Sequence, residues 1–169
     1  MRALPRLPLA ALAAAAACGG RNPRAASNAL AYYESYDPRS LDPALSTDVP
    51  TGEMVTLAFD GLTQFDPDGR LEPALADRWT TERDGRRYVF HLRAGVKFHD
   101  GTPLVAAAVR ASLLRVLSPA TKGGRPWPLY PVAGAQDYAA GRRGDVPGIE
   151  LVGDSSVAFT LTVSDTASP

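Results

Sequence analysis

The stretch YVFHLRAGVKFHDGTPL, residues 88–104, carries the clearest structural pattern in the chain. Tyr88, Phe90 and Leu92 alternate with less apolar neighbours, which predicts a half-buried strand with an aromatic inner face. The pair Asp100-Gly101 favours a tight turn, because both residue types tolerate a positive φ. Pro103 is typical of the first residue of a helix. The stretch therefore predicts a strand, a turn and the start of a helix.

Downstream of this stretch, apolar residues recur at helical spacing and predict an amphipathic helix of about three to four turns that packs on a sheet. The stripe consists of Val105, Val109, Leu113, Val116 and Leu117. Ser118-Pro119 is expected to end this helix. Within the Gly-, Pro- and Arg-rich segment 120–147, we expect a short helix at 133–140. Residues 149–152 and 157–163 predict a hairpin that turns at 153–155.

Upstream, two further Asp-Gly pairs, at 68–69 and 84–85, lie between apolar segments and predict hairpins. Between these hairpins, residues 72–77 predict a turn or a single helical turn. Apolar residues within 54–59 have helical spacing, with Thr51 as the expected N-cap and Gly61 as the end of the helix. Residues 30–33 predict a strand that a loop follows. The elements together predict a mixed α/β or α+β unit.

The first residues have the features of an export signal. Residues 1–6 carry two arginines and no acid, and residues 7–17 are almost wholly apolar but too few to span a bilayer. Cys18 is the only cysteine in the chain, and it follows a run of five alanines at 13–17. This arrangement resembles a bacterial lipobox, in which the cysteine takes a lipid, whereas a plain signal with an Ala-x-Ala site is the alternative. We therefore expect a signal peptide at 1–17 and a flexible tether at 18–29.

Composition and motifs exclude several classes of function. The chain has 169 residues and a formal net charge of +0, which does not favour nucleic acid as a partner. The sequence contains no phosphate-binding loop, zinc-protease motif or nucleophile elbow, so we expect no enzyme, no cofactor and no catalytic residue. His91 and His99 are the only histidines, and two histidines alone predict structural roles rather than a metal site.

Four stretches in order resemble the extracellular solute-binding proteins of family 5, the peptide- and nickel-binding components of ABC importers. Residues 37–43 (DPRSLDP) resemble a family loop, and residues 59–63 (FDGLT) resemble its Y-E-G-L segment. Residues 71–79 (LEPALADRW) resemble P-x-L-A-x-x-W, and residues 88–104 resemble F-x-L-R-x-G-V-K-F-H-D-G-x-P-L. The resemblance extends over about residues 30–161.

The resemblance implies a fold like that of type II periplasmic binding proteins, in which two lobes close on the ligand. Because family members are several times longer, we expect this chain to be an N-terminal piece. It would carry the first strand and the loop of lobe one (30–47) and the extra subdomain that follows (48–169). The implied function is that of a monomeric, lipid-anchored binding protein on the extracytoplasmic side of the membrane, which delivers a short peptide or similar solute to the permease subunits.

The ligand-facing candidates that the resemblance implies are Ser35, Tyr36 and Asp37, whose main-chain groups could pair with an extended peptide. A purely structural loop is the alternative for these three residues. For the whole chain, the alternatives are a structural or adaptor lipoprotein and a fragment with no ligand of its own. Peptide, nickel, haem and sugar all stay open as solutes.

One departure from the family concerns the start of the helix after residue 104. Family members usually have Thr-Ala-x-Asp-Val there, which supplies an N-cap and an acid that favours the positive end of the helix. Residues 105–109 of this chain read VAAAV instead. We therefore expect a helix start that no side chain caps.

Overall fold

A computed structural model describes residues 36–162. The helices in this part are α1 (Val49–Ala58), α2 (Ala106–Leu117) and α3 (Ala135–Ala139), with the short 3-10 turns η2 (Pro43–Leu45), η3 (Pro119–Thr121) and η4 (Trp127–Leu129). The strands are β1 (Thr63–Phe65), β2 (Leu71–Pro73), β3 (Ala76–Glu82), β4 (Arg87–Leu92), β5 (Ile149–Leu151) and β6 (Ser156–Thr160). The predicted segments 1–17 and 18–29, with Cys18, and the predicted strand 30–33 lie outside the described residues.

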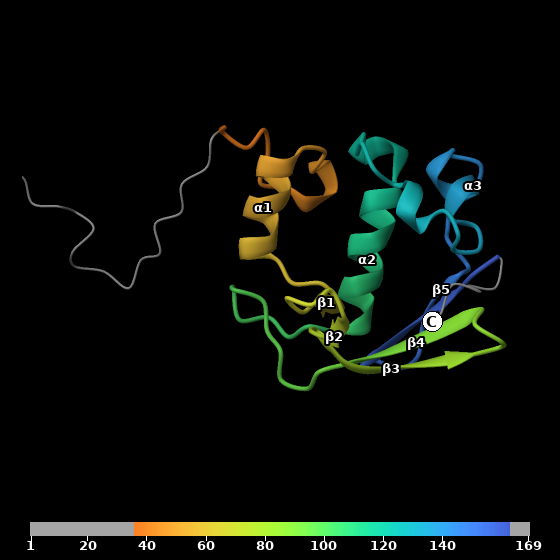
Figure 1. Cartoon of the computed structure of the whole chain (residues 1–169). Coiled ribbons are helices and arrows are strands. Elements are labelled where there is room, and N and C mark those ends of the chain that lie inside the picture. Colours follow the sequence, from red (N-terminus) through yellow and green to blue (C-terminus); the bar gives the residue numbers. More distant parts are fainter. Residues whose placement is uncertain (1–35, 163–169) are drawn as a thin grey trace, which may run out of the picture. The chain divides into compact units, whose positions relative to one another are not determined.

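The strands form two antiparallel sheets. One has the order β3-β4-β6-β5, and the other consists of β1 and β2. Helices α2 and α3 lie on the same side of the larger sheet (Figure 1). The predicted mixture of helices and strands is therefore confirmed. Within residues 36–162, no helix is both long enough and apolar enough to cross a membrane.

All three Asp-Gly pairs lie in turns, as predicted. Gly69 (φ +80°), Gly85 (φ +80°) and Gly101 (φ +87°) adopt the left-handed conformation that glycine tolerates best. The first two pairs connect β1 to β2 and β3 to β4. The third pair closes a smaller turn, in which the Phe98 amide donates to the Thr102 carbonyl at 2.8 Å.

The prediction of a turn or a helical turn at 72–77 is correct only for residues 74–75, which form a bend. Residues 71–73 form β2, which pairs with β1, and β3 already begins at Ala76. Pro73 is compatible with a strand here, because this sheet has only two strands and each has a free edge. Pairing with β1, on the other side of the Asp68-Gly69 turn, therefore decides the conformation of residues 71–73.

Helix α2 begins at Ala106, three residues later than Pro103, where the sequence predicted its start. Pro103 instead forms an isolated antiparallel bridge with Lys97. Flanking residues make the hydrogen bonds of this bridge, with the Leu104 amide donating to the Val96 carbonyl at 3.0 Å. Pro103 therefore fits this position although proline has no N–H to donate. The helix ends at Leu117, and Ser118-Pro119 follows it as predicted.

The two ends of α1 also differ from the prediction. Its N-cap is Asp48, whose carboxylate accepts a hydrogen bond from the Thr51 amide at 3.0 Å, so Thr51 is not the cap. Pro50 favours this earlier start, because proline fits the first turn of a helix. At the other end, Phe59 is already extended (φ −132°), and Gly61 lies beyond the helix in the connection to β1.

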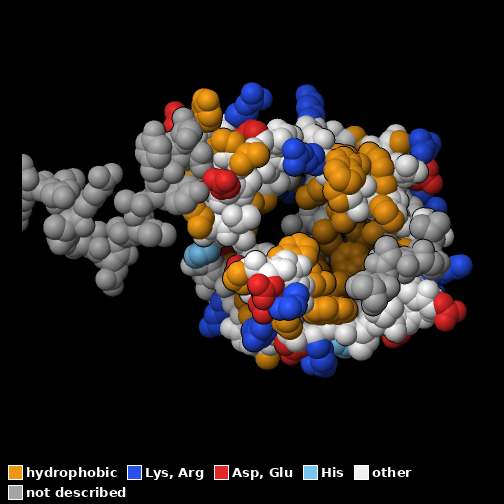
Figure 2. Space-filling view, viewed as in Figure 1, with side chains coloured by type: hydrophobic (Ala, Val, Ile, Leu, Met, Phe, Trp, Pro, Cys, Tyr) orange, Lys and Arg blue, Asp and Glu red, His pale blue; other side chains and the backbone are white. Residues whose placement is uncertain are grey.

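A cluster of fully buried apolar side chains joins α2 to the larger sheet. It consists of Leu117, Val132, Ala135, Val146, Ile149 and Val157. Figure 2 shows hydrophobic side chains gathered in the hollows between the helices and the strands on the viewed face. The short helix predicted at 133–140 is confirmed as α3, which contributes Ala135 to this cluster.

The predicted aromatic face of β4 is present and packs against neighbouring rings. Phe90 stacks on Trp79 with the centroids 6.1 Å apart, and it meets Phe159 edge to face at 5.5 Å. The opposite face is also covered, because Val89 is only 4% exposed. Its partner on β6, Ala158, is fully buried.

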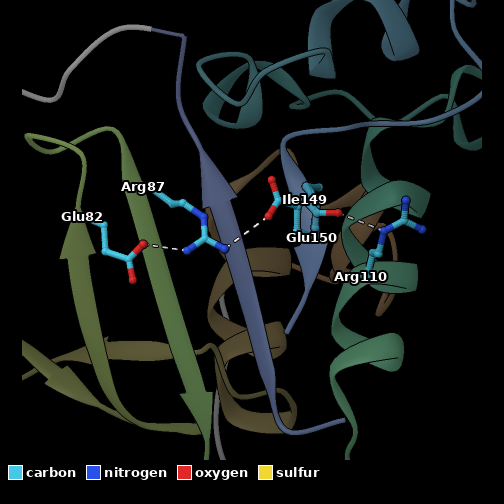
Figure 3. A network of polar contacts seen from close by, with 5 residues as sticks. All are labelled: Glu82, Arg87, Arg110, Ile149 and Glu150. Atoms are coloured by element: carbon cyan, nitrogen blue, oxygen red, sulfur yellow. Dashed lines mark hydrogen bonds and ion pairs between the residues drawn. The ribbon is translucent and has the colours of Figure 1, made fainter. Parts of the chain in front are cut away.

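An arginine connects three strands on that opposite face of the sheet. The Arg87 guanidinium on β4 donates to Glu82 on β3 at 2.7 Å and to Glu150 on β5 at 3.2 Å (Figure 3). The Arg87 side chain is only 15% exposed, and hydrogen bonds to Glu82 and then Glu150 raise the pKa of Arg87 despite its burial. Because β6 lies between β4 and β5, the side chain passes over β6 and ties both outer strands to β4.

We expect Arg87→Ala to lower the free energy of unfolding by about 2 kcal/mol, because it removes two charge-assisted hydrogen bonds and leaves two glutamates close together. Arg78→Ala is the matched control, since the Arg78 side chain is 65% exposed. Within residues 36–162, its only ion pair is with its neighbour Asp77. The control should change the free energy by less than about 0.5 kcal/mol. Urea unfolding measures both, and equal effects would contradict the structural role of Arg87.

The start of α2 has no side-chain cap, as predicted. Val105 occupies the N-cap position, and the Ala106 amide instead donates to the Asp154 carbonyl in the β5–β6 turn at 2.8 Å. Val105→Thr keeps the shape of the side chain and adds an oxygen that can accept from the first turn. We expect it to raise the free energy of unfolding by about 1 kcal/mol.

Val105→Ala is the control for this change, because it removes apolar contacts and adds no cap. It should lower the free energy of unfolding. If the threonine variant were destabilised as much as the alanine variant, the absent cap would not be a weak point of this helix.

Candidate functional site

The SLDP loop, defined here as residues 36–48, leads into α1 and contains two of the predicted ligand-facing residues. Tyr36 is 75% exposed, and Asp37 is exposed beside it. Ser35, the third predicted residue, lies outside the described residues. In Figure 1 the loop lies beside the first turn of α1. Both residues therefore present exposed surface within the part of the chain that the structure describes.

Short-range hydrogen bonds shape the middle of the loop. The Ser40 hydroxyl accepts from the Asp42 amide at 3.0 Å, and the Asp42 carboxylate accepts from the Ala44 amide at 3.0 Å. The second bond caps η2, which seats Ala44 in a position that is only 6% exposed. Ser and Asp favour such local turns. These two hydrogen bonds therefore explain why Ser40 and Asp42 stand in the SLDP loop.

A long-range ion pair ties this loop to α2. Arg115, in the last turn of α2, donates to the Asp42 carboxylate. The hydrogen bond from Arg115 holds the pKa of Asp42 below its ordinary value. Because the folded-state pKa is depressed, the stabilisation is present at neutral pH and is lost as the pH falls through that pKa.

The segment after η3 holds the loop from a second side. A Cβ atom on Gly123 would lie 2.7 Å from the Ala44 carbonyl oxygen, so only glycine permits this close approach. The Arg125 guanidinium also donates to the Thr47 carbonyl at 2.7 Å. The backbone of the loop is therefore held against the C-terminal end of α2 and the chain that follows it.

The start of α1 provides a third attachment. The Arg39 amide donates to the Thr51 hydroxyl at 3.2 Å, and Thr51 is fully buried. The Asp48 carboxylate caps the same turn, and the hydrogen bond from the Thr51 amide lowers its pKa. Residues 39–48 are thus held at several points, while Tyr36 and Asp37 stand just before the first of them.

Two adjoining apolar clefts lie beyond the other end of α1, with volumes of about 330 and 350 Å³. They share five lining residues, namely Phe59, Asp60, Leu75, Phe98 and Leu104. We call them together the α1–α2 cleft, because α1 leads into one wall and residues 108–113 of α2 form part of another. Hydrophobic side chains border hollows on the face shown in Figure 2.

The sequence did not predict this cleft. Phe59 and Phe98 are 49% and 48% exposed, yet each belongs to a motif stretch that carried the family resemblance. The fold leaves them half-exposed, because no described element covers that side.

The two histidines occupy different surroundings. The His91 ring lies 3.0 Å from the Ser156 hydroxyl, which joins β4 to β6, and His99 lines one side of the α1–α2 cleft. Within residues 36–162, no three His, Cys, Asp or Glu side chains gather as a metal site would require. The described arrangement offers an exposed loop and an apolar cleft as surfaces for other molecules.

Known proteins resemble this chain in both sequence and structure. Residues 70–168 match the family described as bacterial extracellular solute-binding proteins, family 5 Middle. The oligopeptide-binding protein OppA of Bacillus subtilis is 30% identical over 126 residues, which are 74% of this chain and 23% of that protein. The probable deoxycholate-binding periplasmic protein YgiS of Escherichia coli is 35% identical over 99 residues, 59% of this chain and 18% of that protein.

Solved structures of related proteins share the fold. Listeria monocytogenes OppA bound to peptide matches 79% of this chain with a TM-score of 0.74 and 26% identity, over 26% of its own length. Haemophilus influenzae OppA in complex with RPPGFSPFR matches 75% of this chain with a TM-score of 0.71 and 28% identity, over 25% of its own length. The chain thus spans about a quarter or less of the length of these relatives.

The match to the family covers more than half of the chain, and the fold agrees with solved members. That family consists of binding proteins rather than enzymes. The chain belongs to the bacterial extracellular solute-binding proteins of family 5.

Proposed function

We propose that the chain supplies one part of the substrate-binding component of an ABC-type oligopeptide importer. The observation that carries this proposal is the SLDP loop, whose middle is held at several points while Tyr36 and Asp37 stay exposed. A binding surface benefits from such a rigid support, because little conformational entropy is then lost when a ligand is bound. The names of the relatives supply the ligand class, since OppA of Bacillus subtilis is an oligopeptide-binding protein.

In this proposal, Ser35, Tyr36 and Asp37 face the peptide. Their main-chain N–H and C=O groups pair with an extended peptide as an added strand would, and this mode accepts peptides of varied sequence. Residues 30–47 then belong to the first lobe of a type II periplasmic binding protein, and residues 48–169 form its extra subdomain. Closure of the two lobes presents the loaded protein to the permease.

The proposal includes export and anchoring. Residues 1–17 act as a signal peptide, and a lipid on Cys18 holds the mature protein at the extracytoplasmic face of the membrane. Residues 18–29 form the tether between that lipid and the fold. The protein acts as a monomer beside its permease subunits.

A chimera tests the peptide-binding role. In OppA of Bacillus subtilis, the segment that matches residues 36–162 is replaced by residues 36–162 of this chain, and oligopeptide binding is measured by calorimetry. We expect the folded chimera to bind oligopeptides. Deoxycholate is the competing ligand, because YgiS is named for it. A folded chimera that binds deoxycholate and no peptide would contradict the proposal.

Two substitutions in the chimera test the main-chain contact. Tyr36→Pro removes the amide hydrogen, and we expect it to weaken peptide binding at least about tenfold, which corresponds to about 1.4 kcal/mol. Tyr36→Ala removes the side chain but keeps the amide, and it should change the affinity by less than about threefold. Equal affinities of both variants and the unmodified chimera would show that Tyr36 does not donate to the peptide.

A further inference from the structure

Four aspartates in the described part of the chain are followed directly by glycine, namely Asp60, Asp68, Asp84 and Asp100. Three of these pairs lie in the turns described above, and the Asp60-Gly61 pair follows α1. An aspartate before glycine can rearrange chemically, because glycine has no side chain to shield its amide nitrogen from the neighbouring carboxyl group. All four aspartates are exposed, so exposure alone does not distinguish them.

In this rearrangement, the main-chain nitrogen of the glycine attacks the carboxyl carbon of the aspartate side chain. A C–N bond forms and a C–O bond of the protonated carboxyl group breaks. The hydroxyl group leaves with the amide proton as water, which gives a cyclic imide. A water molecule then opens the ring at the original main-chain carbonyl, and the chain continues through the side-chain carboxyl group as isoaspartate. The result is a net isomerisation, with water as the only co-reactant.

Both reacting groups of the Asp100-Gly101 pair are engaged in hydrogen bonds. The Gly101 amide donates to the Phe98 carbonyl at 2.9 Å. The Asp100 carboxylate accepts from the Thr102 hydroxyl at 2.6 Å and from the Thr102 amide at 2.9 Å. Bonds from that hydroxyl and then from that amide lower the pKa of Asp100, which disfavours the protonated carboxyl group that reacts. The amide and the carboxyl group must both leave their partners before they can meet.

The Asp68-Gly69 pair is held in a similar way. The Gly69 amide donates to the Asp66 carbonyl at 3.0 Å, and the Arg70 guanidinium donates to the Asp68 carboxylate at 2.8 Å. The Arg70 amide donates to the Asp66 carboxylate at 2.7 Å and closes the turn. Because an exposed ion pair is weak, the protection of Asp68 rests mainly on the bond that holds the Gly69 amide.

The pairs Asp60-Gly61 and Asp84-Gly85 lack these restraints. Within residues 36–162, neither carboxylate forms a hydrogen bond or an ion pair, and neither glycine amide donates a hydrogen bond. The β3–β4 turn also holds Arg83 (φ +52°) and Asp84 (φ +53°) in the left-handed conformation, which is unfavourable for residues with a side chain. The groups that react are therefore free at Asp60 and at Asp84.

We propose that Asp60 and Asp84 are modification sites at which the chain isomerises spontaneously to isoaspartate, while the turns protect Asp68 and Asp100. The hydrogen bonds carry this inference, because all four pairs have the same two residue types and all four aspartates are exposed. Each conversion adds one carbon to the main chain, either between α1 and β1 or at the turn between β3 and β4. The inference does not depend on the proposed function.

Timed incubation of the full chain at mildly acidic pH tests the inference. Peptides from an acidic digest are separated, and mass spectrometry with electron-based fragmentation measures isoaspartate at each of the four positions. We expect conversion at Asp60 and Asp84 to be at least about threefold faster than at Asp68 and Asp100, because a hydrogen bond that must break first slows the reaction by about that factor. The same incubation in guanidinium chloride is the matched control. Unfolding removes the hydrogen bonds, so the four rates should then agree within about twofold.

A variant tests the protection of Asp100 separately. Thr102→Val keeps the shape of the side chain and removes the hydroxyl that donates to Asp100, so we expect conversion at Asp100 to become at least about twofold faster. Thr121→Val is the control, because its hydroxyl donates to the Arg115 carbonyl and to none of the four aspartates. It should leave all four rates unchanged.

Several results would overturn the inference. Equal rates at the four positions of the folded chain would do so, as would an order of rates that persists in guanidinium chloride. Slow conversion at Asp60 or at Asp84 in the folded chain would overturn the assignment of that residue. An unchanged rate at Asp100 in the folded Thr102→Val variant would show that the hydroxyl does not protect it.

Discussion

The packing of helix α2 on strands β5 and β6 is the interaction on which the rest of the described fold depends. Leu117 of α2, Ile149 of β5 and Val157 of β6 are each at most 2% exposed. Full burial of a side chain of this size contributes about 1.5–3 kcal/mol, so these contacts are a large share of the stability of a small unit. The Arg110 side chain of α2 also donates to the Ile149 carbonyl at 3.1 Å (Figure 3).

The same helix supports both candidate functional surfaces. At its C-terminal end, Arg115 holds the SLDP loop through Asp42, and near its middle, Val109 and Leu113 form part of the α1–α2 cleft. The loop and the cleft therefore share one rigid support, although they lie at opposite ends of α1.

Local rules predicted the elements whose conformation depends on a few neighbouring residues. The Asp-Gly turns and the stripe of α2 follow from backbone preferences and periodicity. The short helix α3 was expected because the segment 120–147 is too long to lack secondary structure. The failures involve pairing between neighbouring segments of the chain, which the preferences of single residues do not show. Pro103 pairs with Lys97 instead of starting a helix, and residues 71–73 become a strand because β1 is there to pair with them.

The candidate site was predictable only in part, for a related reason. The motif around Asp42 indicated which loop to consider, but its ion pair with Arg115 joins residues 73 positions apart and has no local signature. The exposure of Phe59 and Phe98 was not predicted either, because the apolar residues of a motif do not show which side the fold leaves uncovered. Such contacts appear only when the chain is folded.

Hydrogen exchange in a Leu117→Ala variant tests the central role of α2 most directly. The substitution leaves a cavity in the core and, by the usual range for such changes, costs about 2–5 kcal/mol. Our account predicts that hydrogen exchange accelerates by comparable factors in α2 and in β6. The same acceleration is expected at the Ala44 amide in the loop and at the Thr51 amide in α1. Faster exchange in α2 and β6 with unchanged exchange at Ala44 and Thr51 would contradict it, because the loop would then not depend on the packing of α2.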